Sequence, residues 1–182
     1  MRYNVGMVRD SFKKKEKLKY IYFWGHRKGN SGVTKSCFSQ WYNSDFTIDG
    51  VTYNCAEQFM MAEKARLFDD KEVLGEILET SEQFRIKYLG RQVKNFDEAI
   101  WNEKKYEIVL KGNLAKFSQD ERIKAFLIST GYKVIVEASP YDTIWGIGMS
   151  EQEAQLSNPI AWRGENLLGF ALMEVRDIIL NG

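Results

Sequence analysis

The chain has 182 residues, and 26 Lys and Arg against 25 Asp and Glu leave a formal net charge of +1. This length predicts one domain with enough chain to bury a core, and a charge near zero argues against a strongly basic nucleic-acid-binding protein. The single histidine, His26, excludes zinc sites with several His ligands and excludes a Ser-His-Asp triad unless His26 is the base. Chemistry must therefore come mostly from carboxylates, Lys, Arg and aromatic side chains.

The cysteines and the N-terminal charge indicate where the chain works. Cys37 and Cys55 form no CxxC pair and suit a reducing compartment such as the cytoplasm, with both thiols as small buried side chains. No run approaches the roughly 18 apolar residues that cross a bilayer, and no secretory signal follows the lysines of segment 13–19. We expect residues 1–19 to form a basic arm, either solvated or in contact with phosphate or nucleic acid, and residues 20–182 to form the domain.

Strand patterns are short. Residues 20–24 predict a strand, and a polar loop follows over 25–36. Asp49-Gly50 predicts a hairpin between 46–48 and 51–53, because both central positions of a type I′ turn need a positive φ.

Helical patterns occupy most of the remainder. Asn54, with Glu57 three residues later, resembles a capping box for a helix that ends near Leu67, and Gly90 suits the C-terminal end of a later helix. The other expected helices cover 71–79, 82–88, 103–117, 120–128 and 167–180, and 132–137 alternates as a strand. These patterns predict an α+β fold, a single helix-dominated domain with a small β-sheet.

One candidate site lies on the helix that follows the hairpin. Glu57 and Lys64 are seven residues apart, so they share one helix face with about 10.5 Å of axial rise between their backbones. The same residues have ordinary explanations, since Glu57 could be a capping partner and Lys64 a solvated lysine. Spacing alone leaves both interpretations open.

A second candidate is the segment 137–148, which leaves a predicted strand. It contains two carboxylates, Glu137 and Asp142, and Trp145-Gly146, which places a flat ring beside a backbone that a ligand can approach closely. An ordinary turn would use similar residues.

Helix ends supply two further candidates. Asn166 is placed to cap the last helix, and an uncapped terminus there would suit a phosphate. Lys116 lies near the end of a long helix, where a cation also interacts favourably with the helix dipole.

Taken together, ordered blocks over residues 20–180 resemble the YbiA-like, or NADAR, family. The blocks are Phe38-Ser39, Asp49-Gly50, Ala56-Glu57 with Lys64, Leu89-Gly90-Arg91, Trp101, Lys116-Phe117, Leu127 with Thr130, Val136-Glu137, Asp142 with Trp145-Gly146, Gly164-x-Asn166-x-x-Gly169 and Leu172-Met173-x-x-Arg176. The usual family pattern is not followed at Gln40, Met61 and Ile147, which bears on the identity of the substrate.

The resemblance implies an enzyme that hydrolyses an N-glycosidic bond of ribose without a cofactor or metal ion. By position, the family's catalytic residues fall on Glu57, Lys64 and Asp142. The expected substrate-binding residues are Phe23, Gly25, Ser39, Arg91, Trp101, Lys116, Glu137, Ser139, Trp145, Gly146 and Asn166. Trp101 and Trp145 would stack on base or sugar, and Arg91 or Lys116 would meet phosphate.

Two substrate classes are implied, the phosphorylated aminopyrimidine riboses of riboflavin biosynthesis and ADP-ribose attached to guanine, the latter in DNA that the basic arm could contact. In either case Glu57 would activate water or stabilise the cationic sugar. Lys64 would act electrostatically or form a Schiff base. The alternative is a non-catalytic module that binds ADP-ribose or an NAD-related nucleotide. The sequence leaves the oligomeric state open.

Overall fold

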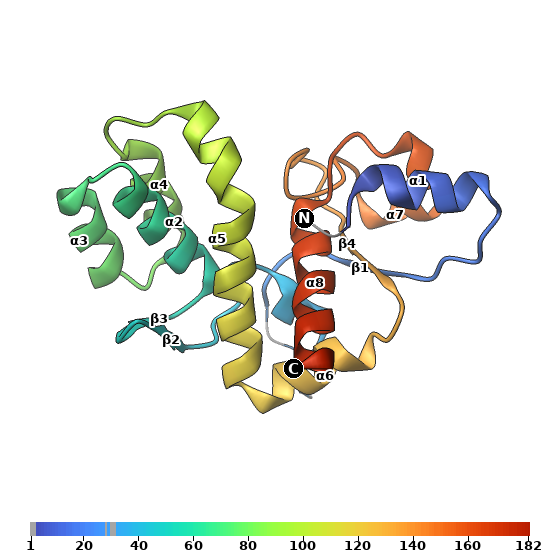
Figure 1. The fold of residues 1–182 in the computed structure, drawn as a ribbon, viewed down its shortest axis with the longest axis horizontal. Helices are drawn as coiled ribbons and strands as arrows, with labels where there is room; N and C mark the ends of the chain where they lie inside the picture. The colour runs from blue at the N-terminus through green and yellow to red at the C-terminus, as the bar shows by residue number, and fades with distance from the viewer. Residues whose placement is uncertain (1–2, 28, 30–31) are drawn as a thin grey trace. The chain divides into compact units, whose positions relative to one another are not determined.

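A computed structural model describes residues 3–27, 29 and 32–182. The chain divides into two compact units, which are treated separately below. Unit 1 contains Met1–Ser39 and Arg122–Gly182, and unit 2 contains Gln40–Glu121. Helices dominate both units and the sheets are small (Figure 1), which confirms the predicted α+β class.

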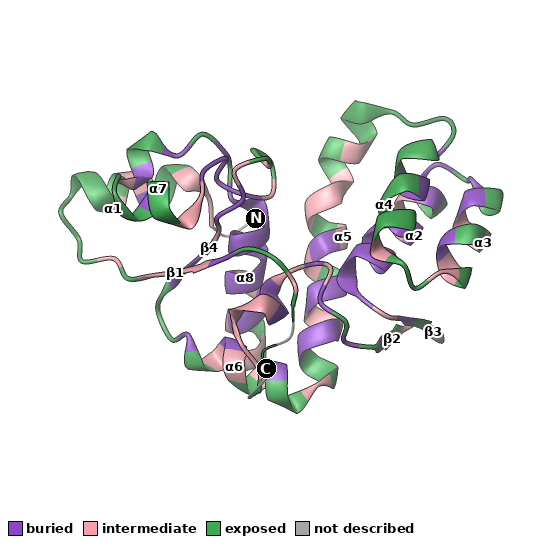
Figure 2. Cartoon of the chain, turned by 180° about the vertical axis from the view of Figure 1, so that it is seen from behind, coloured by how far each residue is buried: buried purple, intermediate pink, exposed green. Residues whose placement is uncertain are grey.

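The centre of unit 1 is a parallel pair of strands covered by the last helix. β1 (Tyr20–Phe23) pairs with β4 (Val134–Glu137), and α8 (Leu167–Asn181) packs against β4. Figure 2 shows α8 buried over most of its length, as expected from its run of apolar residues. The sequence predicts both strands, although the pairing of segments more than 100 residues apart is not a local property.

Short helices complete unit 1. They are α1 (Val5–Lys13), η1 (Lys35–Phe38), α6 (Glu121–Ser129), α7 (Glu151–Gln155) and η2 (Pro159–Ala161). Of these, the sequence pattern predicted only α6.

Helix α1 lies within the segment expected to be a basic arm. The Arg9 guanidinium donates hydrogen bonds to the carbonyl oxygens of Pro159, at 3.2 Å, and Trp162, at 2.7 Å. The Tyr3 hydroxyl donates to the Asp177 carboxylate at 2.6 Å. These bonds attach residues 3–13 to η2 and α8, whereas residues 14–19 after α1 form no helix or strand.

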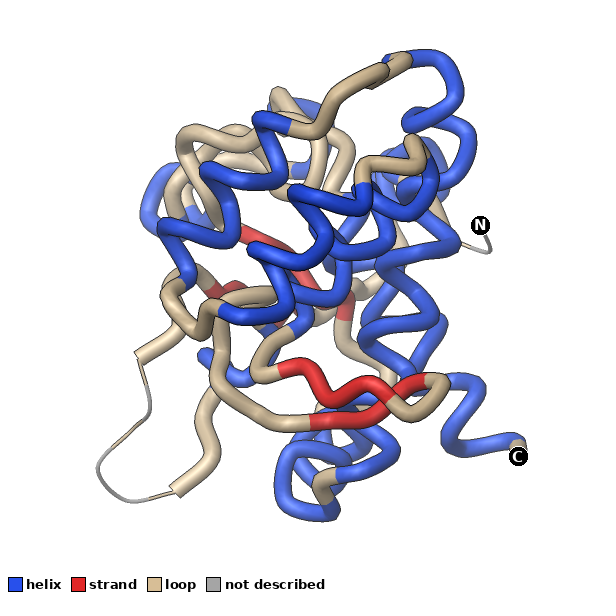
Figure 3. The backbone as a smooth tube through the Cα atoms, turned by 90° about the vertical axis from the view of Figure 1, so that its left-hand side faces the viewer, coloured by secondary structure: helices blue, strands red, loops and turns tan. Residues whose placement is uncertain are grey.

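Unit 2 is built around one buried helix. The hairpin strands β2 (Phe46–Ile48) and β3 (Val51–Tyr53) are followed by α2 (Ala56–Leu67), α3 (Lys71–Glu79), α4 (Gln83–Gln92) and α5 (Glu98–Gln119). Helix α2 packs against α3, α4 and α5 and is buried along most of its length (Figure 2). The predicted hairpin is present (Figure 3), with Asp49 and Gly50 at φ values of 52° and 79°.

The expected capping box at the start of α2 is wrong. The N-cap residue is Cys55, and its side chain makes no capping hydrogen bond. The Asn54 N–H instead donates to Gln58 Oε1 at 2.8 Å. Glu57 is therefore not needed as the capping partner of Asn54.

Two predicted helix boundaries also move. Gly90 does not end α4, which continues to Gln92. The glycine instead allows close helix packing, because a Cβ at this position would lie 2.0 Å from Met61 Sδ. α5 begins at Glu98 rather than at Glu103, since Asp97 Oδ1 accepts the Ile100 N–H at 3.0 Å and caps the helix earlier.

Asn166 occupies the N-cap position of α8, but its side chain does not cap that helix. Its Nδ2 donates to the Ile135 carbonyl at 2.9 Å, and its Oδ1 accepts the Glu137 N–H at 2.9 Å. The N–H groups of Val134 and Ala138 point the other way, toward β1. Asn166 thus satisfies the edge of β4 that no strand covers.

Both cysteines are free and buried, as predicted from their isolation in the sequence. None of the helices formed by the described residues has the length and hydropathy needed to cross a membrane.

The contact between α8 and β4 generates a stability prediction. A Cβ at Gly169 would lie 2.1 Å from the Ile135 carbonyl oxygen and 2.6 Å from both polar atoms of the Asn166 side chain. Because a backbone atom must then move, we expect Gly169→Ala to lower the free energy of unfolding by about 1–3 kcal/mol, measured by denaturant titration.

Gly75→Ala is the matched control. Gly75 lies inside α3 with no atom within 4 Å of an added Cβ, so alanine should stabilise the protein by up to about 1 kcal/mol through helix propensity. Equal effects of the two substitutions would contradict the proposed packing.

Candidate functional site

The residues expected at the site fall in both units, and each set is described within its own unit. In unit 2, Glu57 lies in the first turn of α2 and exposes only 5% of its surface. Its N–H donates to the Gln40 carbonyl oxygen at 2.9 Å. The positive end of the helix dipole favours a carboxylate at this position. Unit 2 therefore holds an acid group in a largely dry environment.

Lys116 is fully buried on α5. Its Nζ lies 5.5 Å from the ring centre of Tyr42 and 5.1 Å from that of Phe117. Burial raises the pKa of the Cys55 thiol to about 11, with the Glu57 carboxylate raising it further and the Lys116 ammonium opposing the shift. The pKa of Cys55 therefore depends on the charges of both Glu57 and Lys116, two residues of the unit 2 core.

Gln40 and Asn113 form a buried amide pair beside Glu57. Asn113 Nδ2 donates to Gln40 Oε1 at 2.8 Å and to the Val109 carbonyl at 2.9 Å. Among the described residues, Gln40 Nε2 and Asn113 Oδ1 have no hydrogen-bond partner, although both are buried. One donor and one acceptor next to Glu57 are thus available to a water molecule or a ligand. Asn113 was missed by the sequence analysis, because a single Asn inside a helix carries no local signal.

Lys64 lies two turns after Glu57 on α2 and is half-buried. Its Nζ donates to the Gly90 carbonyl at 2.8 Å. Burial lowers the pKa of the Lys64 ammonium, and the nearby charge of Arg91 lowers it further. None of the described carboxylates contributes to this shift. The environment therefore makes the neutral amine, the form that can act as a nucleophile, easier to reach than in a solvated lysine.

Two aromatic rings border Lys64. Nζ lies 4.2 Å from the ring centre of Phe96 and 5.7 Å from that of Trp101, a residue in the first turns of α5. The structure thus brings together three predicted residues, Lys64, Arg91 and Trp101. Phe96 was missed, because it belongs to a connecting segment with no helical or strand pattern.

In unit 1, Asp142 organises the loop after β4. Its Oδ1 accepts the N–H groups of Ile144, at 2.9 Å, and Trp145, at 2.7 Å. This Asx turn is an ordinary role for an aspartate. It also fixes the orientation of a carboxylate that remains partly exposed.

Gly146 and Gly164 allow the loop to pack closely. A Cβ at Gly146 would lie 2.9 Å from the Glu137 carbonyl oxygen, and one at Gly164 would lie 2.3 Å from the Gly146 carbonyl oxygen. Backbone bonds from Asn166 to Gly146 and from Leu168 to Trp145 tie the same segment to the start of α8. The half-exposed Trp145 ring is therefore carried by a rigid frame.

The remaining predicted ligand-binding residues of unit 1 differ in accessibility. Ser139 is buried, and Glu137 and Ser39 are partly exposed, whereas Gly25 is exposed with a φ of 81°. Phe23 exposes only 1% of its surface and packs edge-to-face on Phe38. Phe23 and Asn166 accordingly act as internal supports.

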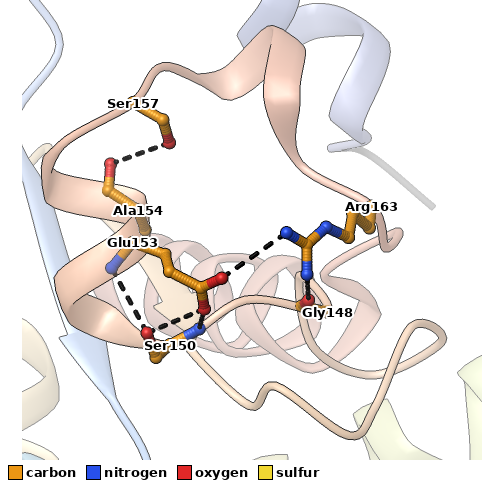
Figure 4. Close-up of polar contacts among 6 residues, drawn as sticks. All are labelled: Gly148, Ser150, Glu153, Ala154, Ser157 and Arg163. Atoms are coloured by element: carbon orange, nitrogen blue, oxygen red, sulfur yellow. Dashed lines mark hydrogen bonds and ion pairs between the residues drawn. The ribbon is translucent and has the colours of Figure 1, made fainter.

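Figure 4 shows how the loop continues into α7. Ser150 Oγ accepts the Glu153 N–H at 3.2 Å, while the Ser150 N–H and hydroxyl both donate to the Glu153 carboxylate at 2.8 Å. These bonds hold the pKa of Glu153 below its usual value. Arg163 bridges Glu153 Oε1, at 3.4 Å, and the Gly148 carbonyl, at 3.3 Å. The end of the loop is thereby connected to the segment before α8.

Chemically, the two units supply different groups. Unit 2 has a buried carboxylate, a buried lysine and a second lysine with a lowered pKa. Unit 1 has an oriented carboxylate and a half-exposed tryptophan. No cluster of three His, Cys, Asp or Glu side chains suited to a metal ion occurs within residues 3–27, 29 and 32–182.

Comparison with known proteins relates this arrangement to one family. Residues 22–180 match the model of the NADAR domain. The chain is 46% identical to N-glycosidase R617 of Acanthamoeba polyphaga mimivirus over 87% of this chain and 95% of that protein. It is 28% identical to N-glycosidase YbiA of Escherichia coli over 78% of each protein. A solution NMR structure of E. coli YbiA superimposes with a TM-score of 0.73 over 91% of this chain and 87% of that one, at 24% identity, and therefore supports the fold. The chain belongs to the NADAR family.

Proposed function

We propose that this chain cleaves the bond between a ribose carbon and a nitrogen atom in a phosphorylated or nucleotide-linked ribose. Like its named relatives, it is a hydrolase of N-glycosyl compounds. The observation that carries the proposal is the pair of α2 residues, Glu57 in a dry environment and Lys64 with a lowered pKa. A module that only binds a nucleotide needs neither feature.

The charges that develop during the reaction explain why the site would use both Glu57 and Lys64. Breaking the bond builds positive charge on the sugar and negative charge on the leaving nitrogen. The Glu57 carboxylate stabilises the cationic sugar or activates the attacking water. In the version that uses Lys64, its free amine displaces the base at the anomeric carbon, and the leaving nitrogen takes a proton from the amine. The bond between the anomeric carbon and the ring oxygen then breaks, the ring oxygen takes up a proton, and the opened sugar is held as an imine on Lys64. Water hydrolyses the imine, which releases the sugar and restores the amine.

Two substrate classes fit this chemistry, an aminopyrimidine ribose phosphate of riboflavin biosynthesis and ADP-ribosyl-guanine. Arg91 or Lys116 would bind phosphate in either case. If the guanine is part of DNA, the lysines of segment 13–19 are available to the backbone. Incubation with each substrate in parallel, followed by chromatography of released base, distinguishes them. Ligand binding without release of base would favour the alternative, a non-catalytic module for ADP-ribose or a related nucleotide.

Replacing Glu57 tests its charge. Glu57→Gln keeps the size of the side chain, so we expect a fall in kcat of roughly 100- to 10,000-fold, the usual contribution of a positioned acid or base. Chromatographic release of base measures the rate, and thermal unfolding checks the fold. Glu63→Gln is the control, because Glu63 lies on the same helix and pairs with Arg66 at 2.6 Å. Wild-type turnover by Glu57→Gln would remove Glu57 from the mechanism.

Borohydride trapping tests Lys64. Reduction during turnover should leave a stable sugar adduct on Lys64, and Lys64→Arg should leave none. Adduct yield should rise as the pH passes upward through the lowered pKa of Lys64, since only the neutral amine reacts.

Arg91→Gln refines this test. Removing the positive charge of Arg91 should raise the pKa of Lys64 and move the rise in adduct yield to higher pH. Arg85→Gln is the control and should leave this pH unchanged, because Arg85 pairs with Glu76 and does not contribute to the Lys64 shift. If turnover proceeds without any adduct, Lys64 acts electrostatically.

Asp142 would bind ribose hydroxyls or assist proton transfer, and Asp142→Asn tests the binding role separately. An asparagine Oδ1 can still accept the two loop N–H groups, so the loop should persist while the charge is lost. We expect a higher KM with a smaller change in kcat, measured by steady-state kinetics. Asp142→Ala, which also removes the loop bonds, is the comparison. An unchanged KM in both variants would exclude a contact between Asp142 and substrate.

A further inference from the structure

Helix α4 exposes a row of aromatic and cationic side chains, of which only Arg91 has a role in the proposed reaction. Phe84 exposes 72% of its surface and Tyr88 exposes 54%, although both are large apolar rings. Phe84, Lys87, Tyr88 and Arg91 follow the spacing i, i+3, i+4 and i+7, so they lie along one face of α4. Together with Trp41 they form what we call the aromatic–cationic stripe.

Trp41 is held at the start of the stripe. Its ring lies 5.0 Å from that of Phe84 in an edge-to-face arrangement, and Lys87 Nζ lies 5.5 Å from the Trp41 ring centre. Gln83 Nε2 donates to the Trp41 carbonyl at 3.4 Å and to Asn43 Oδ1 at 2.8 Å, which ties this loop to α4. The rings are thus organised before any ligand arrives.

The local charges favour an anionic partner. Arg85 beside the stripe is neutralised by Glu76 at 2.6 Å, and Glu82 at the N-cap of α4 brings one negative charge. Among the described residues, neither Lys87 nor Arg91 makes an ion pair with a carboxylate. The stripe therefore offers two available cations among three rings.

We propose that the aromatic–cationic stripe binds a short segment of single-stranded nucleic acid. Bases stack on exposed aromatic rings whatever their sequence, while Lys and Arg attract the phosphates between them, and this combination is typical of single-strand binding. Phe84 and Arg91 are about 10.5 Å apart along the helix, so the stripe is long enough to contact more than one nucleotide.

The stripe ends beside the candidate nucleophile. Lys64 Nζ donates to the carbonyl oxygen of Gly90 at 2.8 Å, directly before Arg91, the last residue of the stripe. A strand on the stripe would thus run toward Lys64, Phe96 and Trp101. This extends the nucleotide-linked form of the proposed function and selects a base attached to a polynucleotide rather than a free small molecule.

Binding can be tested without turnover. Fluorescence anisotropy with a labelled, unmodified 12-nucleotide oligothymidine should show saturable binding that weakens with salt, and a blunt duplex of the same length should bind more weakly. Phe84→Ala and Tyr88→Ala should each weaken single-strand binding by about 5- to 150-fold, the usual effect of losing one stacked base. Lys87→Gln should reduce the slope of log affinity against log salt by about 0.7.

Matched controls come from unit 1. Tyr132 and Lys133 are also exposed, so Tyr132→Ala and Lys133→Gln remove a ring and a charge outside the stripe. Weakening by the stripe variants alone supports the proposal. No binding, equal effects of the controls, or preference for the duplex would overturn it. Because the probe carries neither an ADP-ribosyl group nor an aminopyrimidine ribose phosphate, these outcomes are independent of whether the chain hydrolyses its proposed substrate.

Discussion

The burial of α2 is the constraint on which unit 2 depends. Three helices pack around α2, and its first turns are closed to solvent, so Glu57 is held out of water. Burying a carboxylate is costly, and this helix carries Glu57 at the end where backbone N–H groups are not used by the helix itself. The same packing places Lys64 next to Phe96 and lowers the pKa of its ammonium. One helix therefore places a carboxylate and an amine in two different environments.

In unit 1, polar contacts fix the loop that follows β4, because the sheet is too small to do so. Its two strands leave one edge of β4 without a strand partner, and the Asn166 side chain satisfies that edge. Asp142 then fixes the beginning of the loop and the Ser150–Glu153 bonds fix its end. The backbone of Trp145 is held by polar contacts to Asp142 and Leu168.

The sequence predicts the structural features that depend on residues close together in the chain. Asp49-Gly50 identifies the hairpin because the turn requires both residues to adopt a positive φ, and the long helices follow from apolar periodicity. Phe96 and Asn113 could not be found this way, since Phe96 contacts Lys64 and Asn113 bonds to Gln40, both distant in the sequence. Asn166 and Gly90 look like helix caps in sequence, yet tertiary packing gives them other roles. The ordered family motifs indicated Glu57 and Lys64 in the sequence. The burial of Glu57 and the lowered pKa of Lys64 could be seen only in the folded structure.

The two buried cysteines have a practical consequence. Cys37 belongs to unit 1 and Cys55 to unit 2, and neither side chain is accessible in the folded chain. Burial raises the pKa of the Cys55 thiol to about 11, so at pH 7 only about one molecule in 10,000 carries the reactive thiolate there. Alkylation of either thiol therefore requires its unit to open. The chain thus carries one native chemical reporter in each unit, and the rates at which the two thiols are modified measure local opening of the units independently.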